Sequence, residues 1–102
     1  MRVISPKTLR QFWERHRAAE MPLRAWLKIA EQTNWASIQH VRQTYPHADA
    51  VPVSSGRTTT VFNIGDGKFR LITAIHYNTR RIFVLRVLTH REYDRAAWKE
   101  QL

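Results

Sequence analysis

The chain contains no cysteine among its 102 residues, which excludes disulfide scaffolds and zinc or redox sites that depend on thiolates. With only three glycines, it has no glycine-rich loop of the kind that cradles phosphates. No segment approaches the roughly 18 apolar residues of a membrane-spanning helix. Residues 1–7 lack the apolar stretch of a signal peptide. We therefore expect a cytoplasmic protein that does not enter a membrane.

Acidic residues are also scarce, because eight Asp and Glu stand against 17 Lys and Arg, a formal net charge of +9. Self-repulsion on this scale opposes folding, so it indicates an acidic partner: a nucleic acid, an anionic membrane or an acidic protein. Hydrophobic residues nevertheless make up 43% of the chain, with four tryptophans. This is too apolar for a disordered basic tail, and residues 1–102 are expected to form one domain with a buried core.

Helical periodicity dominates the first half of the chain. Ser5 and Pro6 are typical of a helix start, with a hydroxyl N-cap and a proline at the first position, and they predict a helix over residues 6–17. After an interruption at residues 20–22, apolar residues return at helical spacing over residues 23–33. Two consecutive helices with a short joint indicate a helical hairpin.

The second half is expected to be rich in strands. Ser37 is expected to cap a short third helix, and residues 46–60, rich in Pro, Ser and Thr, are expected to form the longest loop. From there on the hydrophobic period is two, which is typical of strands joined by tight turns. The predicted strands are residues 2–4, 61–64, 68–77 and 81–88.

These elements predict an α+β fold, in which an N-terminal helical hairpin packs on one side of a twisted antiparallel β-sheet. The other side of the sheet is expected to be partly open. Thr89 and Glu92 have the spacing of a capping box, so a C-terminal helix containing Tyr93 and Trp98 is expected to follow the last strand.

The positive charge is concentrated in the predicted sheet, because residues 57–91 hold seven basic residues and a single acid, Asp66. Arg70 and Arg86 stand out, since each lies inside an otherwise apolar strand. Strand alternation places Arg70 on a face with Lys68 and Ile72, and Arg86 on a face with Ile82, Val84 and Leu88. Either arginine could pair with an acid or be solvent-exposed. Both together favour a concave phosphate-binding site, because arginine matches phosphate geometry.

Among the five histidines, His90 is the candidate for proton transfer, because it opens the capped helix beside Arg91 and near Tyr93. His16, His40 and His47 follow ordinary surface patterns. The histidines do not have metal-ligand spacing, so no metal or other cofactor is expected. RNA cleavage suits such a chain, because the RNA supplies its own 2′-OH as nucleophile and the protein needs only cations and proton-transfer groups.

Four blocks of the sequence, taken in order, resemble the HigB family of type II toxins, within the RelE/ParE superfamily. The blocks are residues 1–9, 22–26, 61–65 with 68–72, and 89–94, and the resemblance covers essentially the whole chain. It implies an mRNA interferase, an endoribonuclease that cuts mRNA on the ribosome without metal and leaves a 2′,3′-cyclic phosphate. It also implies a helix-turn-helix antitoxin of the HigA type as partner.

The resemblance also carries site residues. It implies a phosphate-binding role for Arg70, and it matches His90 and Arg91 to a basic pair after the last strand. The site predicted from all these arguments has the catalytic residues His90, Arg70 and Tyr93 and the RNA-binding residues Lys68, Arg70, Arg86, Arg91 and Arg57. Two alternatives stay open: a ParE-like toxin that inhibits gyrase and cuts nothing, and a non-catalytic nucleic-acid-binding domain.

Overall fold

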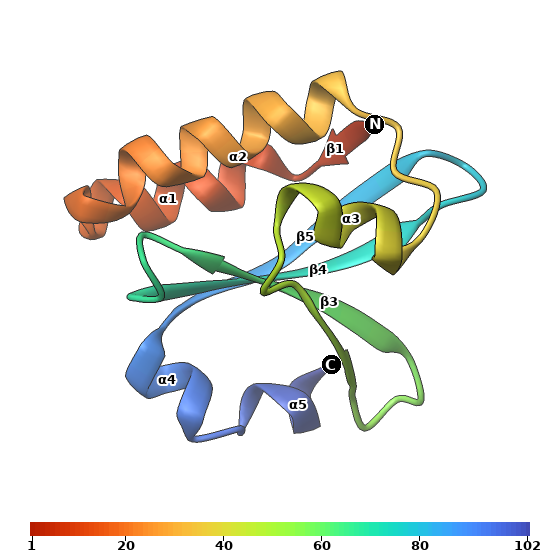
Figure 1. Cartoon of the computed structure of the whole chain (residues 1–102). Helices are drawn as coiled ribbons and strands as arrows, with labels where there is room; N and C mark the ends of the chain where they lie inside the picture. Colours follow the sequence, from red (N-terminus) through yellow and green to blue (C-terminus); the bar gives the residue numbers. More distant parts are fainter.

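The computed structural model describes all of residues 1–102. Figure 1 shows the helices α1 and α2 above a sheet and the short helices α4 and α5 below it, so the predicted α+β class is confirmed. None of the helices has both the length and the hydropathy of a membrane-spanning segment. The elements are β1 (Arg2–Ile4), α1 (Pro6–Arg15), η1 (Arg17–Ala19), α2 (Glu20–Gln32), α3 (Ile38–Thr44), β2 (Asp49–Pro52), β3 (Thr58–Ile64), β4 (Phe69–His76), β5 (Arg81–Thr89), α4 (His90–Asp94) and α5 (Trp98–Gln101).

The sheet is mixed, with the strand order β1-β5-β4-β3-β2. The four strands from β2 to β5 are antiparallel neighbours, in agreement with the predicted antiparallel sheet. However, β1 pairs parallel to β5, from Arg2 opposite Arg81 to Ile4 opposite Phe83. The sequence analysis assigns no partner to residues 2–4, and the structure adds them to the antiparallel strands as a parallel edge strand. Three isolated residues without a turn signal carry no information about the direction of pairing.

The segment predicted as the longest loop, residues 46–60, contains strand β2 and the beginning of β3. Val51 and Val53 are buried on one side of this segment. Pro52 is tolerated because β2 is an edge strand, where a missing N–H does not interrupt the ladder. The proline and the serines of this segment favour a loop, and they outweighed the short alternation of apolar and polar residues in the strand that pairs with β3.

Two helix starts also differ from the prediction. Ser5 precedes α1 in a left-handed conformation (φ 67°), and its hydroxyl does not cap the helix. Helix α2 begins at Glu20, so Pro22 lies in its first turn. A proline costs nothing there, because the first N–H groups of a helix have no partner within the helix. Ser37 does cap α3, where its side chain accepts a hydrogen bond from the backbone N–H of His40.

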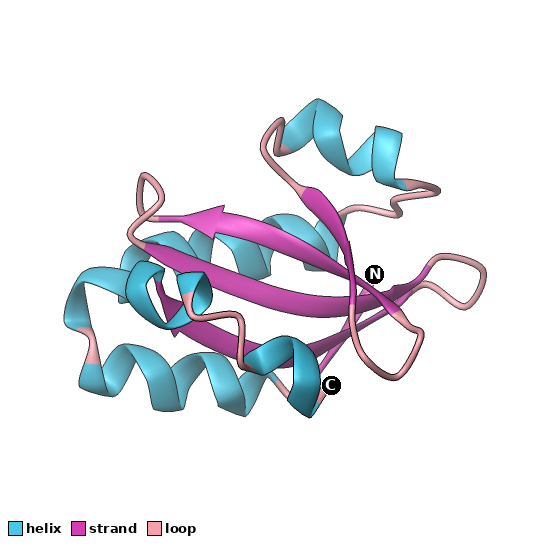
Figure 2. Ribbon diagram, turned by 90° about the horizontal axis from the view of Figure 1, so that it is seen from below, coloured by secondary structure: helices cyan, strands magenta, loops and turns pink.

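The molecule has two hydrophobic clusters, one on each face of the sheet. We call the face of the sheet covered by α1 and α2 the upper face and the face toward α4 and α5 the lower face (Figure 1). The larger cluster joins α1 and α2 to the upper face and includes Trp26, Trp35 and Phe62. The smaller cluster lies on the lower face and consists of Val51, Val53, Val61, Ile72 and Trp98. Figure 2, seen from below, shows the C-terminal segment in front of the strands. The predicted open side is thus closed in part by this segment, with Trp98 as its buried anchor.

A β-bulge shifts the register between β4 and β5. Ile72 lies opposite Arg86 but Thr73 lies opposite Val84, so Leu85 is the extra residue. Paired residues share a face of the sheet, and Val84 belongs to the upper cluster whereas Ile72 belongs to the lower one.

The bulge therefore moves Arg86 to the lower face, together with Ile72 and, two positions along β4, Arg70. The predicted face for Arg86, shared with Ile82 and Val84, is wrong. The reason is that strand alternation is reset by the inserted residue, and the sequence gives no signal of the bulge.

The predicted C-terminal helix is divided in two at Ala96, which adopts a positive φ of 59° between α4 and α5. A left-handed alanine costs about 1 kcal/mol relative to glycine. We therefore expect Ala96→Gly to raise the free energy of unfolding by about 1 kcal/mol, measured by thermal denaturation. The control Ala25→Gly, on the exposed side of α2, should lower it by about 1 kcal/mol. A destabilised Ala96→Gly variant would contradict this geometry.

Candidate functional site

Arg70, the second residue of β4, is the centre of the candidate site. Its half-buried guanidinium donates from Nη1 to the carbonyl oxygens of Gly67 (2.6 Å) and Phe69 (3.2 Å). The Gly67 carbonyl is presented by a tight turn in which Gly65, Asp66 and Gly67 all have positive φ. These bonds fix the side chain and leave its Nε and Nη2 donors for a ligand, which is the fork that binds phosphate in two places.

Tyr93 and Trp98 support the guanidinium from the C-terminal segment. The Cζ atom of Arg70 lies 5.4 Å from the centre of the Tyr93 ring. The Trp98 ring stacks on Tyr93 at 5.2 Å between centroids, and its Nε1–H donates to the Tyr93 carbonyl at 3.2 Å. Tyr93 therefore has contacts on its ring from both Arg70 and Trp98, and it offers a ligand chiefly its hydroxyl edge.

The phenol of Tyr93 is a proton donor at neutral pH. Burial raises its pKa above the ordinary value, the charges of Asp49 and Asp94 raise it further, and Arg70 acts in the opposite direction. The phenol can therefore donate a hydrogen bond, but it does not supply a phenolate base.

His90 forms an ion pair or hydrogen bond with Asp94 one helical turn later, with 2.8 Å between Nδ1 and Oδ2. Because the carboxylate engages Nδ1, the Nε2 atom is the one that faces away and can exchange a proton with a ligand. The backbone N–H of His90 donates to the Lys68 carbonyl at 2.9 Å. This bond holds the start of α4 against the start of β4.

The capping box that positions His90 is confirmed. The Thr89 hydroxyl accepts from the N–H of Glu92 at 3.2 Å, and the Glu92 carboxylate accepts from the N–H of Thr89 at 2.9 Å. The backbone hydrogen bond to Thr89 is the main cause that lowers the pKa of Glu92, so this carboxyl stays ionised and keeps its cap at neutral pH.

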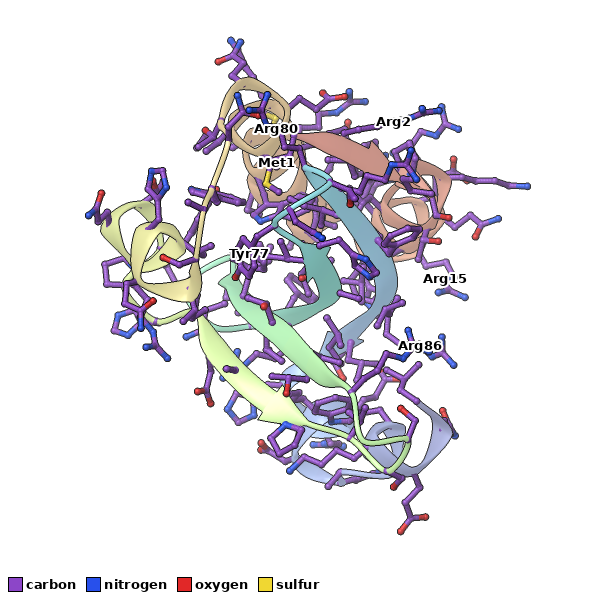
Figure 3. The ribbon with its side chains drawn as sticks, turned by 90° about the vertical axis from the view of Figure 1, so that its right-hand side faces the viewer. Met1, Arg2, Arg15, Tyr77, Arg80 and Arg86 are labelled. Carbon is purple, nitrogen blue, oxygen red and sulfur yellow. The ribbon has the colours of Figure 1, made fainter.

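Lys68, Arg86 and Arg91 complete the cationic surface around this site. Lys68 and Arg91 are exposed, and Arg86 is half-buried with Nη1 bonded to the Leu85 carbonyl at 2.9 Å. Arg86 is a diagonal neighbour of Arg70 across the two strands, about 7–8 Å away. Figure 3 shows the side chains of Arg86 and Arg15 pointing outward on the same side of the molecule.

The alternative that an acid neutralises Arg70 or Arg86 is wrong. The ion pairs of the structure involve neither residue. Both guanidiniums instead bind backbone carbonyls, which fixes them without cancelling their charge. The lower face consequently keeps two half-buried positive charges on adjacent strands.

Arg57 is not brought together with the other predicted residues. It precedes β3, whereas Arg70 lies opposite Asn63 near the other end of that strand. Asn63 lies six positions after Arg57 along the strand, a distance of about 20 Å. The structure therefore groups Lys68, Arg70, Arg86, His90 and Tyr93, with Arg91 on the same short helix, and leaves Arg57 apart.

Sequence reasoning missed Asp94, Trp98 and Asn63 as members of this region. The spacing of four between His90 and Asp94 is a readable signal, because it places both side chains on one face of a helix. Asn63 could be found from the tight turn, which sets it opposite Arg70. The stack of Trp98 on Tyr93 depends on the bend at Ala96, for which the sequence has no signal.

The fold and the site together define a small basic α+β domain whose lower face holds fixed guanidiniums. Helix α4, held against the start of β4, carries an imidazole oriented by Asp94. This combination suits a phosphodiester, since it joins anion binding to proton transfer. No group of three or more His, Asp or Glu side chains is placed to hold a metal ion.

Comparison with known proteins gives the family. Residues 19–96 match the sequence profile of HigB toxins, described as the RelE-like toxic component of a toxin-antitoxin system. The chain is also 21% identical over 95 residues to the mRNA interferase HigB of Escherichia coli O6:H1 (strain CFT073). The aligned region covers 93% of this chain and 90% of that protein. The chain belongs to the HigB toxin family, as the sequence blocks indicated, and a cognate antitoxin is therefore its partner.

Proposed function

We propose that this toxin is an endoribonuclease that cleaves mRNA on the ribosome through attack of the RNA's own 2′-OH on the adjacent phosphate. The observation that carries the proposal is the pair formed by a fixed, unneutralised Arg70 and an oriented His90 at neighbouring strand and helix starts. The name of the E. coli relative, an mRNA interferase, supports the same activity.

In the proposed reaction, the free Nε and Nη2 donors of Arg70 bind the scissile phosphate. Arg86 and Lys68 add positive charge around it. The phosphorus gains negative charge when the 2′-oxygen adds, and cations already in place stabilise that state most. Arg91 and Arg57 contact phosphates further along the RNA strand or the ribosomal RNA.

His90 is proposed as the general acid or base, through Nε2. With His90 as base, the O2′–P bond forms as the 2′-OH passes its proton to Nε2, and the P–O5′ bond breaks as the leaving oxygen takes a proton from water. With His90 as acid, water accepts the 2′-OH proton and the protonated imidazole gives its own to the leaving oxygen. The products are a 2′,3′-cyclic phosphate and a 5′-OH. The attacking and the leaving oxygen both belong to the RNA, so the step consumes no water molecule as nucleophile.

The partners and location of the toxin form part of the proposal. We propose that the antitoxin is a helix-turn-helix protein of the HigA type, and that the toxin acts in the cytoplasm, where translated mRNA is found. An acidic or apolar segment of the antitoxin laid over the cationic lower face would block substrate entry through charge complementarity.

The proposal is tested by inducing the toxin in cells and mapping new 5′ ends on a reporter mRNA and on the same mRNA without its start codon. The expected result is rapid cleavage inside the translated reading frame and little cleavage in the untranslated copy. Growth arrest with intact mRNA and altered plasmid supercoiling would indicate a gyrase inhibitor. Salt-dependent RNA binding without cleavage would indicate a binding domain.

Two substitutions of Tyr93 distinguish the contribution of its ring to cleavage from that of its hydroxyl. Since the ring supports Arg70, we expect Tyr93→Phe to keep most of the cleavage activity, whereas Tyr93→Ala lowers it about 10- to 100-fold. The measurement is the initial rate of cleavage on translating ribosomes at matched toxin concentration. Equal losses in both variants would instead assign the proton transfer to the phenol.

A further inference from the structure

A polar cavity of about 370 Å³ opens beside Arg70, and no hydrophobic residue lines it. It lies between the connection from α3 to β2 and the tight turn from β3 to β4. Its lining residues are His47, Asn63, Asp66 and Gly67. Its volume is within the range of small-ligand sites, about 300–1,000 Å³.

The cavity adjoins the proposed phosphate site, because residues that line the cavity also pair with or bind Arg70. Asn63 lies directly opposite Arg70 in the strand register. Gly67, which lines the cavity, accepts the 2.6 Å hydrogen bond from Arg70 Nη1, and a Cβ atom at Gly67 would come within 3.6 Å of the same nitrogen. A nucleotide whose phosphate is bound by Arg70 therefore has this cavity next to it.

The side chains that line the cavity are free to bind a ligand. His47, Asn63 and Asp66 are exposed, and none takes part in an ion pair. Their side chains also form no hydrogen bond with the rest of the chain, in contrast to Arg70. Together they present an acceptor-only carboxylate, an amide and an imidazole.

Asp66 is unexpected at this place, because it is the single acid among residues 57–91. A carboxylate next to a phosphate site repels the RNA backbone, so general RNA affinity does not explain it. The turn does not require it either: φ is 56° at Asp66, and asparagine or glycine adopts that conformation at least as well. A direct contact with N–H donors of a ligand explains the carboxylate.

We propose that this cavity binds a guanine base of the nucleotide next to the cleaved bond. Guanine is the RNA base whose pairing edge presents two adjacent donors, N1–H and N2–H, and the two oxygens of Asp66 can accept both. The amide of Asn63 can donate to guanine O6, and the His47 ring borders the base. The inference deepens the proposed ribonuclease function and rests on it.

The sharpest variant is Asp66→Asn, which keeps the size and the left-handed backbone but exchanges one acceptor oxygen for a donor. Cleavage sites are mapped by sequencing 5′ ends after induction. The wild type is expected to favour guanine at one fixed position beside the cut. In Asp66→Asn that preference should fall about tenfold, while cleavage at other sites continues. The control Glu31→Gln makes the same charge change at the end of α2 and should keep the guanine preference.

A second measurement is independent of cleavage. In NMR titrations with 3′-GMP and 3′-CMP, the Gly67 amide and the Asn63 side-chain amide should shift with 3′-GMP only, and Asp66→Asn should lose this response. A wild type that responds to 3′-GMP but cuts no RNA would refute the proposed ribonuclease and leave the guanine site standing. Equal responses to both nucleotides, or an unchanged guanine preference in Asp66→Asn, would overturn the guanine site.

Discussion

Replacing Arg70 with alanine is expected to relieve growth arrest and to lower the rate of mRNA cleavage about 10²- to 10³-fold. Two features cause this large effect. The guanidinium is fixed by the Gly67 carbonyl and the Tyr93 ring, and no acid neutralises it. Fixed charge is most effective where new negative charge develops, because no reorganisation is needed during the reaction.

Arg70→Lys should recover only a small part of the activity, because an ammonium group cannot form the two-donor fork. The matched control is Arg24→Ala, which also removes an arginine stacked on an aromatic ring, 4.6 Å from the centre of Trp13, but on the helical side. That variant should remain toxic. A fully toxic Arg70→Ala at equal expression would show that Arg70 does not bind the scissile phosphate.

Replacing His90 with alanine is expected to reduce cleavage about 10²- to 10⁴-fold, the usual range for loss of a general acid or base. The structure gives two reasons to expect the loss at this histidine. Asp94 engages Nδ1 at 2.8 Å, and the capping box together with the bond to the Lys68 carbonyl fixes the helix start. The measurement is the single-turnover rate of cleavage on programmed ribosomes.

His76→Ala is the control for His90, since His76 is also exposed and lies on the lower face, against Phe83 at 5.0 Å between ring centroids. It should leave cleavage unchanged. Asp94→Asn should lower the rate while the fold is retained, because the amide no longer selects one orientation of the imidazole. If His90→Ala and His76→Ala cleave equally fast, the proton is moved by another group.

Secondary-structure elements whose ends are marked by nearby residues in the sequence could be predicted, and elements that depend on distant partners could not. The capping boundaries at Ser37 and Thr89 follow from side chains that bond to the adjacent backbone. The parallel pairing of β1 and the short strand β2 depend on distant partners, and three or four residues carry too little pattern to indicate them. Pro22 looked like an interruption because the sequence does not show how close it lies to a helix start.

The site was predictable where one local rule was enough. Alternation in β4 placed Arg70 and Ile72 on one face, and the capping box placed His90 at the start of a helix. Arg86 reached the same face only through the bulge at Leu85. The cavity beside Arg70 depends on how the connection before β2 meets the tight turn at Asp66, so composition and spacing give no signal of it.

A single 2′-deoxy substitution in the mRNA shows whether the RNA's own 2′-OH attacks a phosphate held on the lower face. Ribosomes are programmed with an mRNA that carries the substitution at the nucleotide before the mapped cut, and the products of the unmodified mRNA are analysed by mass. The unmodified mRNA should give a 2′,3′-cyclic phosphate, and the mRNA should remain uncut at the substituted position. Undiminished cleavage of the 2′-deoxy substrate would contradict this mechanism, because the nucleophile would then come from outside the RNA.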